Sequence, residues 1–170
     1  MRAYLSVLLA GLVSICSGNS FAQAVEKEPA AVIELGGAAG RGLTDGQSNF
    51  GPAVALEVTP IENWLELEAG LTPLFRRRSM EWSVDLLFKK PWTLSDKTEF
   101  MLGIGPEWIH TKANGIKMNS AAGEVAPDFM FWSSKKYRFG WYLEPSYEYK
   151  LGPAHEKSLG ISAGLLIGIP

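Results

Sequence analysis

The chain has 170 residues, of which 46% are hydrophobic, so it is long enough to bury a core and too apolar to be disordered. Lysine and arginine number 16 and aspartate and glutamate 18, for a formal net charge of −2, which gives no attraction for nucleic acid. The single cysteine excludes an internal disulfide and a zinc site built from several thiolates. One domain is expected.

The first 24 residues have the pattern of a secretory signal peptide. An apolar run over 3–16 is followed by a small polar stretch and then by Ala22-Gln23-Ala24, which matches the small-residue cleavage pattern. The apolar run is shorter than the roughly 20 residues that a helix needs to span a bilayer. We therefore predict a signal peptide over 1–24, removed before Val25. A lipoprotein signal acylated at Cys16 is the alternative, although the residue before it is bulkier than such a signal requires.

The rest of the chain alternates apolar and polar residues in eight segments that are separated by turn-forming residues. No segment has a sustained helical period. The predicted strands are 31–39, 52–60, 64–74, 80–89, 98–109, 123–132, 137–149 and 157–169. This pattern predicts an all-β domain over 25–170.

Each predicted strand has one apolar face and one face with acids and small residues. Leu86 and Asp85, for example, lie on opposite faces because successive side chains of a strand alternate. The acids that share the face of the small residues are Glu34, Glu57, Glu66, Glu68, Glu81, Asp85, Glu99, Glu107, Glu124, Asp128, Glu144 and Glu148. Lys89 and Arg138 are the bases that we place on that face.

A sheet with one apolar face can close in two ways. A lipocalin-like carrier encloses a small apolar ligand with that face, whereas an outer-membrane barrel turns it towards lipid and fills its lumen with polar side chains. The predicted strands are near the about 9 to 11 residues that cross a bilayer. The even strand number, the signal peptide and the lack of cysteine after it also favour the membrane barrel. We predict an eight-stranded antiparallel up-and-down transmembrane β-barrel and keep the periplasmic carrier as the alternative.

Aromatic residues lie mostly towards the ends of the predicted strands, as in the interfacial girdles of membrane barrels. They are Trp64, Trp82, Trp92, Trp108, Trp132, Trp141, Tyr137, Tyr147 and Tyr149. Such barrels have short periplasmic turns and longer outer loops. We therefore expect periplasmic termini and outer loops at 40–50, 72–79, 111–122 and 152–156.

The chain resembles the small eight-stranded bacterial outer-membrane barrels of the outer-membrane protein A and X type. The resemblance covers 25–170 and rests on the strand pattern and on Ser162-x-Gly164-x-x-Ile167-x-Ile169, which is similar to their C-terminal targeting signal. The chain departs from that signal by ending in Ile169-Pro170 instead of an aromatic residue. The resemblance implies a monomer in the Gram-negative outer membrane, in contact with its lipid and lipopolysaccharide and inserted by the barrel-assembly machinery. It also implies a non-enzymatic role, structural or in surface interaction.

Three consecutive arginines, Arg76, Arg77 and Arg78, lie in the expected outer loop 72–79. Guanidinium groups bind phosphates in a bidentate manner, so contact with lipopolysaccharide is one interpretation. A solvated charge run is the other.

The acid-rich face predicts a cluster of carboxylates in the lumen. Its members are Glu57, Glu66, Glu68, Glu81, Asp85, Glu107, Glu124, Asp128, Glu144 and Glu148. We expect a hydrated hydrogen-bonding network, with a narrow cation pathway as the alternative. No spacing matches a calcium loop, so neither a metal nor another cofactor is expected.

Among catalytic reactions, the residues fit acyl transfer by a serine with a histidine base best. A lipid A-modifying esterase of similar architecture uses a His-x-Ser pair on one strand, where both side chains share a face. His110 has no serine two residues on, and His155 and Ser158 are three residues apart. We therefore predict no catalytic residue, with such an esterase as the less favoured alternative.

Overall fold

The computed structural model describes residues 29–76, 79–134, 136–152 and 155–170. In these ranges no helix is long and apolar enough to cross a membrane. The strands are β1 Ala31–Gly42, β2 Ser48–Ile61, β3 Leu65–Arg76, β4 Ser79–Ser95, β5 Thr98–Ala113, β6 Ile116–Trp132, β7 Phe139–Lys150 and β8 Lys157–Ile169. The predicted signal peptide lies outside the described residues and stays a prediction.

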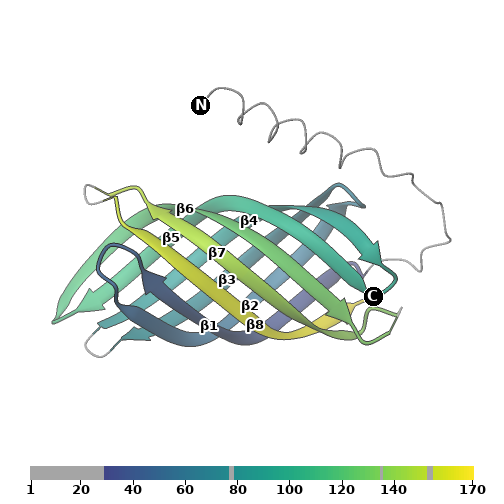
Figure 1. Cartoon of the computed structure of the whole chain (residues 1–170), viewed down its shortest axis with the longest axis horizontal. Coiled ribbons are helices and arrows are strands. Elements are labelled where there is room, and N and C mark those ends of the chain that lie inside the picture. The colour runs from purple at the N-terminus through teal and green to yellow at the C-terminus, as the bar shows by residue number, and fades with distance from the viewer. Residues whose placement is uncertain (1–28, 77–78, 135, 153–154) are drawn as a thin grey trace, which may run out of the picture.

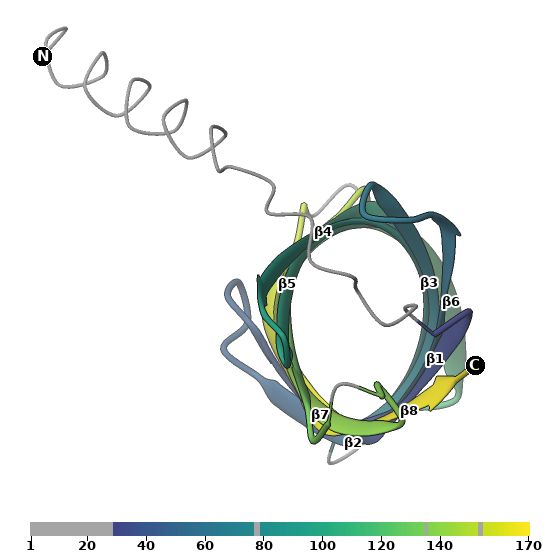
Figure 2. The ribbon, with the colours of Figure 1, turned by 90° about the vertical axis from the view of Figure 1, so that its right-hand side faces the viewer.

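The strands form one closed barrel in which each pairs antiparallel with the next (Figures 1 and 2). The barrel closes where β1 pairs with β8, from Ala31 opposite Ile169 to Gly42 opposite Ser158. Closure leaves no unpaired strand edge, which a chain in lipid requires. The predicted eight-stranded up-and-down barrel is therefore confirmed. The strand number is even, so the start of β1 and the end of β8 lie at the same end of the barrel, called here the terminal end.

Several strands are longer than the alternation predicted. β6 begins at Ile116 instead of Gly123, and β5 continues to Ala113. These two strands meet in a two-residue turn at Asn114 and Gly115, which have φ angles of 50° and 81°. Positive φ at both positions suits the tight turns of hairpins. The expected loop over 111–122 is therefore wrong, because ladder pairing continues almost to the tip of this hairpin.

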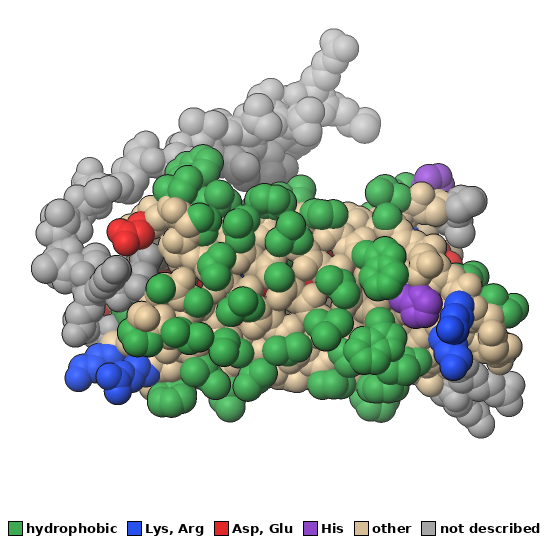
Figure 3. Space-filling model, turned by 180° about the vertical axis from the view of Figure 1, so that it is seen from behind, with side chains coloured by type: hydrophobic (Ala, Val, Ile, Leu, Met, Phe, Trp, Pro, Cys, Tyr) green, Lys and Arg blue, Asp and Glu red, His purple; other side chains and the backbone are tan. Residues whose placement is uncertain are grey.

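The apolar face of the sheet lies on the outside of the barrel. Leu86 is 41% exposed, Ile104 63% and Leu165 63%, on three different strands. Figure 3 shows hydrophobic side chains spread over the middle of one face, with basic side chains at its two ends. Such a belt matches the lipid-facing surface of a membrane barrel. It contradicts the carrier alternative, which needs the apolar face inside.

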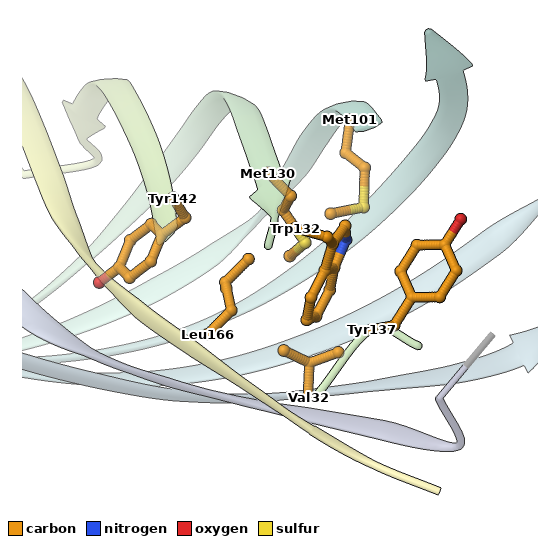
Figure 4. Packing of buried hydrophobic residues seen from close by; sticks show 7 residues of the cluster. All are labelled: Val32, Met101, Met130, Trp132, Tyr137, Tyr142 and Leu166. Atoms are coloured by element: carbon orange, nitrogen blue, oxygen red, sulfur yellow. The ribbon is translucent and has the colours of Figure 1, made fainter. Parts of the chain in front are cut away.

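An apolar cluster lies inside the barrel near the terminal end. It consists of Val32, Met101, Met130, Trp132, Tyr137, Tyr142 and Leu166. Most of these side chains gather around Trp132, whereas the ring of Tyr142 is directed away from it (Figure 4). The rings of Trp132 and Tyr137 pack edge to face, with 5.3 Å between their centroids. These two aromatic residues were expected in the girdle, and that expectation is wrong because both point inward. The cluster plugs the lumen at this end.

Candidate functional site in the lumen

The ten acids of the predicted cluster all lie on the inner face of the barrel. Seven are buried, namely Glu57, Glu66, Glu68, Glu81, Glu107, Asp128 and Glu144, and Asp85, Glu124 and Glu148 are partly buried. Glu34 joins them from β1 and is 2% exposed. Arg138, which we expected to neutralise part of this cluster, is exposed and precedes the first residue of β7. It therefore contributes no charge to the lumen.

Lys89 lies at the centre of the half of this cluster that is nearer the terminal end, called here the inner half. The half nearer the opposite end is called the outer half. Its side chain is fully buried, and its Nζ lies 3.0 Å from Asp128 Oδ2, 2.7 Å from Glu144 Oε2 and 3.7 Å from Glu57 Oε2. A fourth carboxylate, that of Glu68, is also in ion-pair contact with this nitrogen. One ammonium group thus connects β4 with β2, β3, β6 and β7 across the lumen. Buried charges persist only with such pairing.

Four carboxylates around Lys89 have a spacing that could suit a metal ion. One oxygen from each of Glu34, Glu57, Glu68 and Asp128 lies within 4.8 Å of the others. Three of these residues are ion-pair partners of Lys89. The lysine ammonium therefore supplies the cation that these oxygens attract.

The outer half of the lumen has carboxylates without such a partner. Asp85 lies directly opposite Glu107 on β4 and β5, and Glu124 lies directly opposite Glu148 on β6 and β7. Like charges at opposed positions repel each other. Ser83 donates a hydrogen bond to Glu107, and Ser158 donates one of 2.9 Å to Glu148. Among the described residues no lysine or arginine forms an ion pair with these four acids.

These acids line a cavity of about 110 Å³ that begins beside Glu34 and Glu68 and runs away from the terminal end. A wider cavity of about 810 Å³ adjoins it between the outer parts of the strands. Arg76 and Lys150 are among the residues that line both cavities. The acid-lined space therefore opens at the end opposite the termini, while the apolar plug lies at the other end.

Two of the basic residues at this opening form ion pairs with acids. Lys150 Nζ lies 3.3 Å from Glu81 and 3.7 Å from Glu156. Arg76 Nη1 lies 3.1 Å from Asp45 Oδ2. Arg77 and Arg78 lie outside the described residues, so their predicted contact with lipopolysaccharide stays a prediction, as does that of Arg76.

The two histidines have different partners, and neither of these is an acid. His110 projects from the outer face of β5, stacks on Trp108 and has its Nδ1 2.7 Å from Asn119 Oδ1. His155 lies in the β7–β8 connection, stacks on Tyr149 and has its Nδ1 2.9 Å from the tyrosine hydroxyl. Neither geometry is that of a serine nucleophile with its base.

Sequence reasoning missed several inward residues. Lys150 has the same parity as Glu148 in β7, and Leu166 that of Ser162 and Gly164 in β8, so the alternation contained the signal. Asn49 was missed for a different reason, because the predicted second strand began only at Pro52. The structure begins that strand at Ser48 and buries Asn49.

No protein-family model and no curated protein matches the sequence. Among solved structures, Neisserial surface protein A is similar at a TM-score of 0.70 and 12% identity, over 85% of this chain and all of that one. The attachment invasion locus protein Ail of Yersinia pestis is similar at 0.56 and 15%, over 83% and 99%. The N-terminal β-barrel domain of Pseudomonas aeruginosa OprF is similar at 0.55 and 10%, over 83% and 100%. At these identities the likeness establishes the fold, which is that of the small outer-membrane β-barrels.

Proposed function

We propose that the chain is an integral protein of the bacterial outer membrane with a structural or surface-interaction role in the envelope. One observation supports this most strongly: a closed barrel carries an apolar belt outside and charged side chains inside. In water that belt would expose many large apolar side chains, whereas in a bilayer it contacts acyl chains. Similarity to the three solved barrels supports the same location.

The proposal includes the route and the orientation. Residues 1–24 direct export and are then removed. Residues 25–170 enter the membrane as a monomer through the barrel-assembly machinery, which recognises the signal in the C-terminal strand. Both termini face the periplasm. The wider cavity and Arg76 then face the cell exterior, where Arg76, Arg77 and Arg78 contact lipopolysaccharide phosphates.

The interior supports a structural role better than conduction. Trp132 and Tyr137 pack in the apolar cluster across the lumen, and Lys89 is held by carboxylates next to it. Eight strands enclose a lumen that side chains can fill. This favours a closed barrel over the narrow cation pathway. The separate partners of His110 and His155 favour a protein without catalysis over the esterase.

Fractionation of the native envelope tests the proposed location. We expect the protein with the outer membrane, resistant to extraction by high salt and carbonate and soluble in detergent. Its mobility on a gel without heating should differ from that of the heated protein, because a folded barrel resists detergent unfolding. Recovery in the soluble periplasmic fraction without detergent would contradict the proposal.

A further inference from the structure

We propose that the acid-lined cavity in the outer half of the lumen binds a small linear organic cation with two or more primary ammonium groups. The cavity is the one of about 110 Å³ that begins beside Glu34 and Glu68. This inference goes beyond the proposed surface role. It does not depend on it, because the cavity belongs to the folded barrel in any lipid or detergent.

The charge of the cavity wall is the first argument. Its lining contains ten carboxylates and four basic side chains. Two of those bases, Arg76 and Lys150, form ion pairs with acids at the mouth. Deeper inside, Asp85 opposes Glu107 and Glu124 opposes Glu148, and in the described part of the chain no lysine or arginine lies within ion-pair distance of these four acids. A cation between these pairs would remove two repulsions.

Buried oxygen atoms without a partner are the second and independent argument. Glu107 is 8% exposed, and its Oε2 accepts no hydrogen bond. Glu34 is 2% exposed and Asn49 7%, and each also has a buried oxygen without a donor. All three residues line the same cavity. Because each of these atoms is an acceptor, the complementary ligand is a donor, and an ammonium group supplies three N–H donors with a positive charge.

The spacing of the oxygens favours an amine over a metal ion. A hard cation such as calcium needs six to eight oxygens converging at about 2.3–2.6 Å. Among the described residues, one group of four carboxylates has oxygens within 4.8 Å of one another, and this group surrounds Lys89. Among the described residues, the remaining acids form no second group of three or more with oxygens that close together. Charges spaced along a flexible chain match that arrangement.

Lys89 shows how the barrel holds such a group. Its ammonium lies among Glu68, Asp128 and Glu144, at the inner limit of the cavity. The outer acids offer opposed pairs of carboxylates that have no lysine or arginine within ion-pair distance in the described part of the chain. A ligand ammonium entering from the wide cavity would therefore lie between carboxylates, as the ammonium of Lys89 does.

The test uses the folded barrel in a zwitterionic detergent at low salt. Isothermal titration calorimetry with 1,5-diaminopentane and spermidine should show saturable binding that weakens as salt rises. Pentylamine, with one ammonium group, should bind more weakly than the diamine. The double variant Asp85→Asn with Glu107→Gln should lose on the order of tenfold in affinity or more, because two carboxylates no longer attract the ligand. Glu62→Gln, which removes an exposed carboxylate outside the cavity, should bind as the original protein does.

A second measurement needs no variant. A water-soluble diazo compound, which does not react with amines, esterifies accessible carboxyl groups with loss of N2, and mass spectrometry identifies the sites. Spermidine should protect Asp85 and Glu148 but not Glu62. Absence of saturable binding, equal protection of Glu62, or tighter binding of calcium than of the diamine would each overturn the proposal. In the first case the cavity holds only water and protons.

Discussion

Lys89 and Asp128 form a fully buried ion pair, with 3.0 Å between Nζ and Oδ2 and neither side chain exposed. The two residues come from β4 and β6, which are separated by β5 in the barrel. Their contact therefore spans β5 on the inner side of the barrel and is independent of the backbone ladder. It ties β4 to β6 at the level next to the apolar plug.

Replacing Lys89 by methionine should destabilise the barrel strongly. Methionine keeps most of the side-chain volume but removes the charge shared by four carboxylates. Breaking a buried ion pair from one side costs about 3–5 kcal/mol. Urea unfolding in lipid vesicles, followed by tryptophan fluorescence, measures the difference. The control Lys112→Met, at an exposed position of β5, should change the free energy of unfolding by about 0.5 kcal/mol or less.

A second stability prediction concerns Gly36, which faces the ring of Tyr142. A Cβ at this position would lie 2.7 Å from the tyrosine hydroxyl and closer still to the carbonyl oxygen of Ala163. Gly36→Ala should therefore destabilise the barrel by about 1–3 kcal/mol, as overpacking does. Gly123 is the matched control in β6, because no atom lies within 4 Å of its added Cβ. If Gly123→Ala lost as much stability as Gly36→Ala, the steric contacts with Ala163 and Tyr142 would not be the cause.

The alternation of side chains was enough to predict the fold and the face on which each acid lies. Alternation depends only on the local backbone, so it fixed the inward side of Glu57 and Asp85 without knowledge of the barrel. It failed at Trp132 and Tyr137, because we treated all aromatic residues near strand ends as lipid-facing. Trp132 has the parity of the inward Asp128, and that signal was available.

The partners of Lys89 could not be predicted. Which residues meet across a lumen depends on the tilt and stagger of the strands, and these are set by closure of the whole barrel. Glu57 and Glu68 are direct neighbours on β2 and β3, yet the sequence places Lys89 far from both. Alternation also does not mark where a strand ends when the strand continues, with polar residues, beyond the membrane-spanning part. The start of β6 shows this.

Lipid contact of the two sheet faces can be tested with single cysteines. Leu86 is 41% exposed on the outside, whereas Asp85 faces the lumen. In a variant without Cys16, a fluorophore on Leu86→Cys should be quenched by a lipid-phase quencher, and one on Asp85→Cys should be spared. The opposite pattern would place the acids against lipid and reverse the inside and outside of the barrel.

Contact with lipopolysaccharide should depend on the arginines at the open end of the barrel. Replacing Arg76, Arg77 and Arg78 by glutamine should lower the affinity for lipopolysaccharide, most clearly at low salt. Surface plasmon resonance with the barrel in detergent measures the loss. The matched control replaces Lys97, Lys136 and Arg138 by glutamine. These are three exposed bases near the terminal end. An unchanged affinity in the arginine variant at low salt would leave these residues as a solvated charge run.

The histidines should have no part in catalysis. A general base must lie within about 3 Å of the hydroxyl that it activates. In this barrel the Nδ1 of His110 meets an asparagine oxygen at 2.7 Å, and that of His155 meets the hydroxyl of Tyr149 at 2.9 Å. Purified protein in bilayers that contain lipid A should therefore release no fatty acid between about pH 5 and 9, a range that spans the titration of an unperturbed imidazole. Acyl release that disappears in His110→Asn or His155→Asn would show that the barrel is an enzyme.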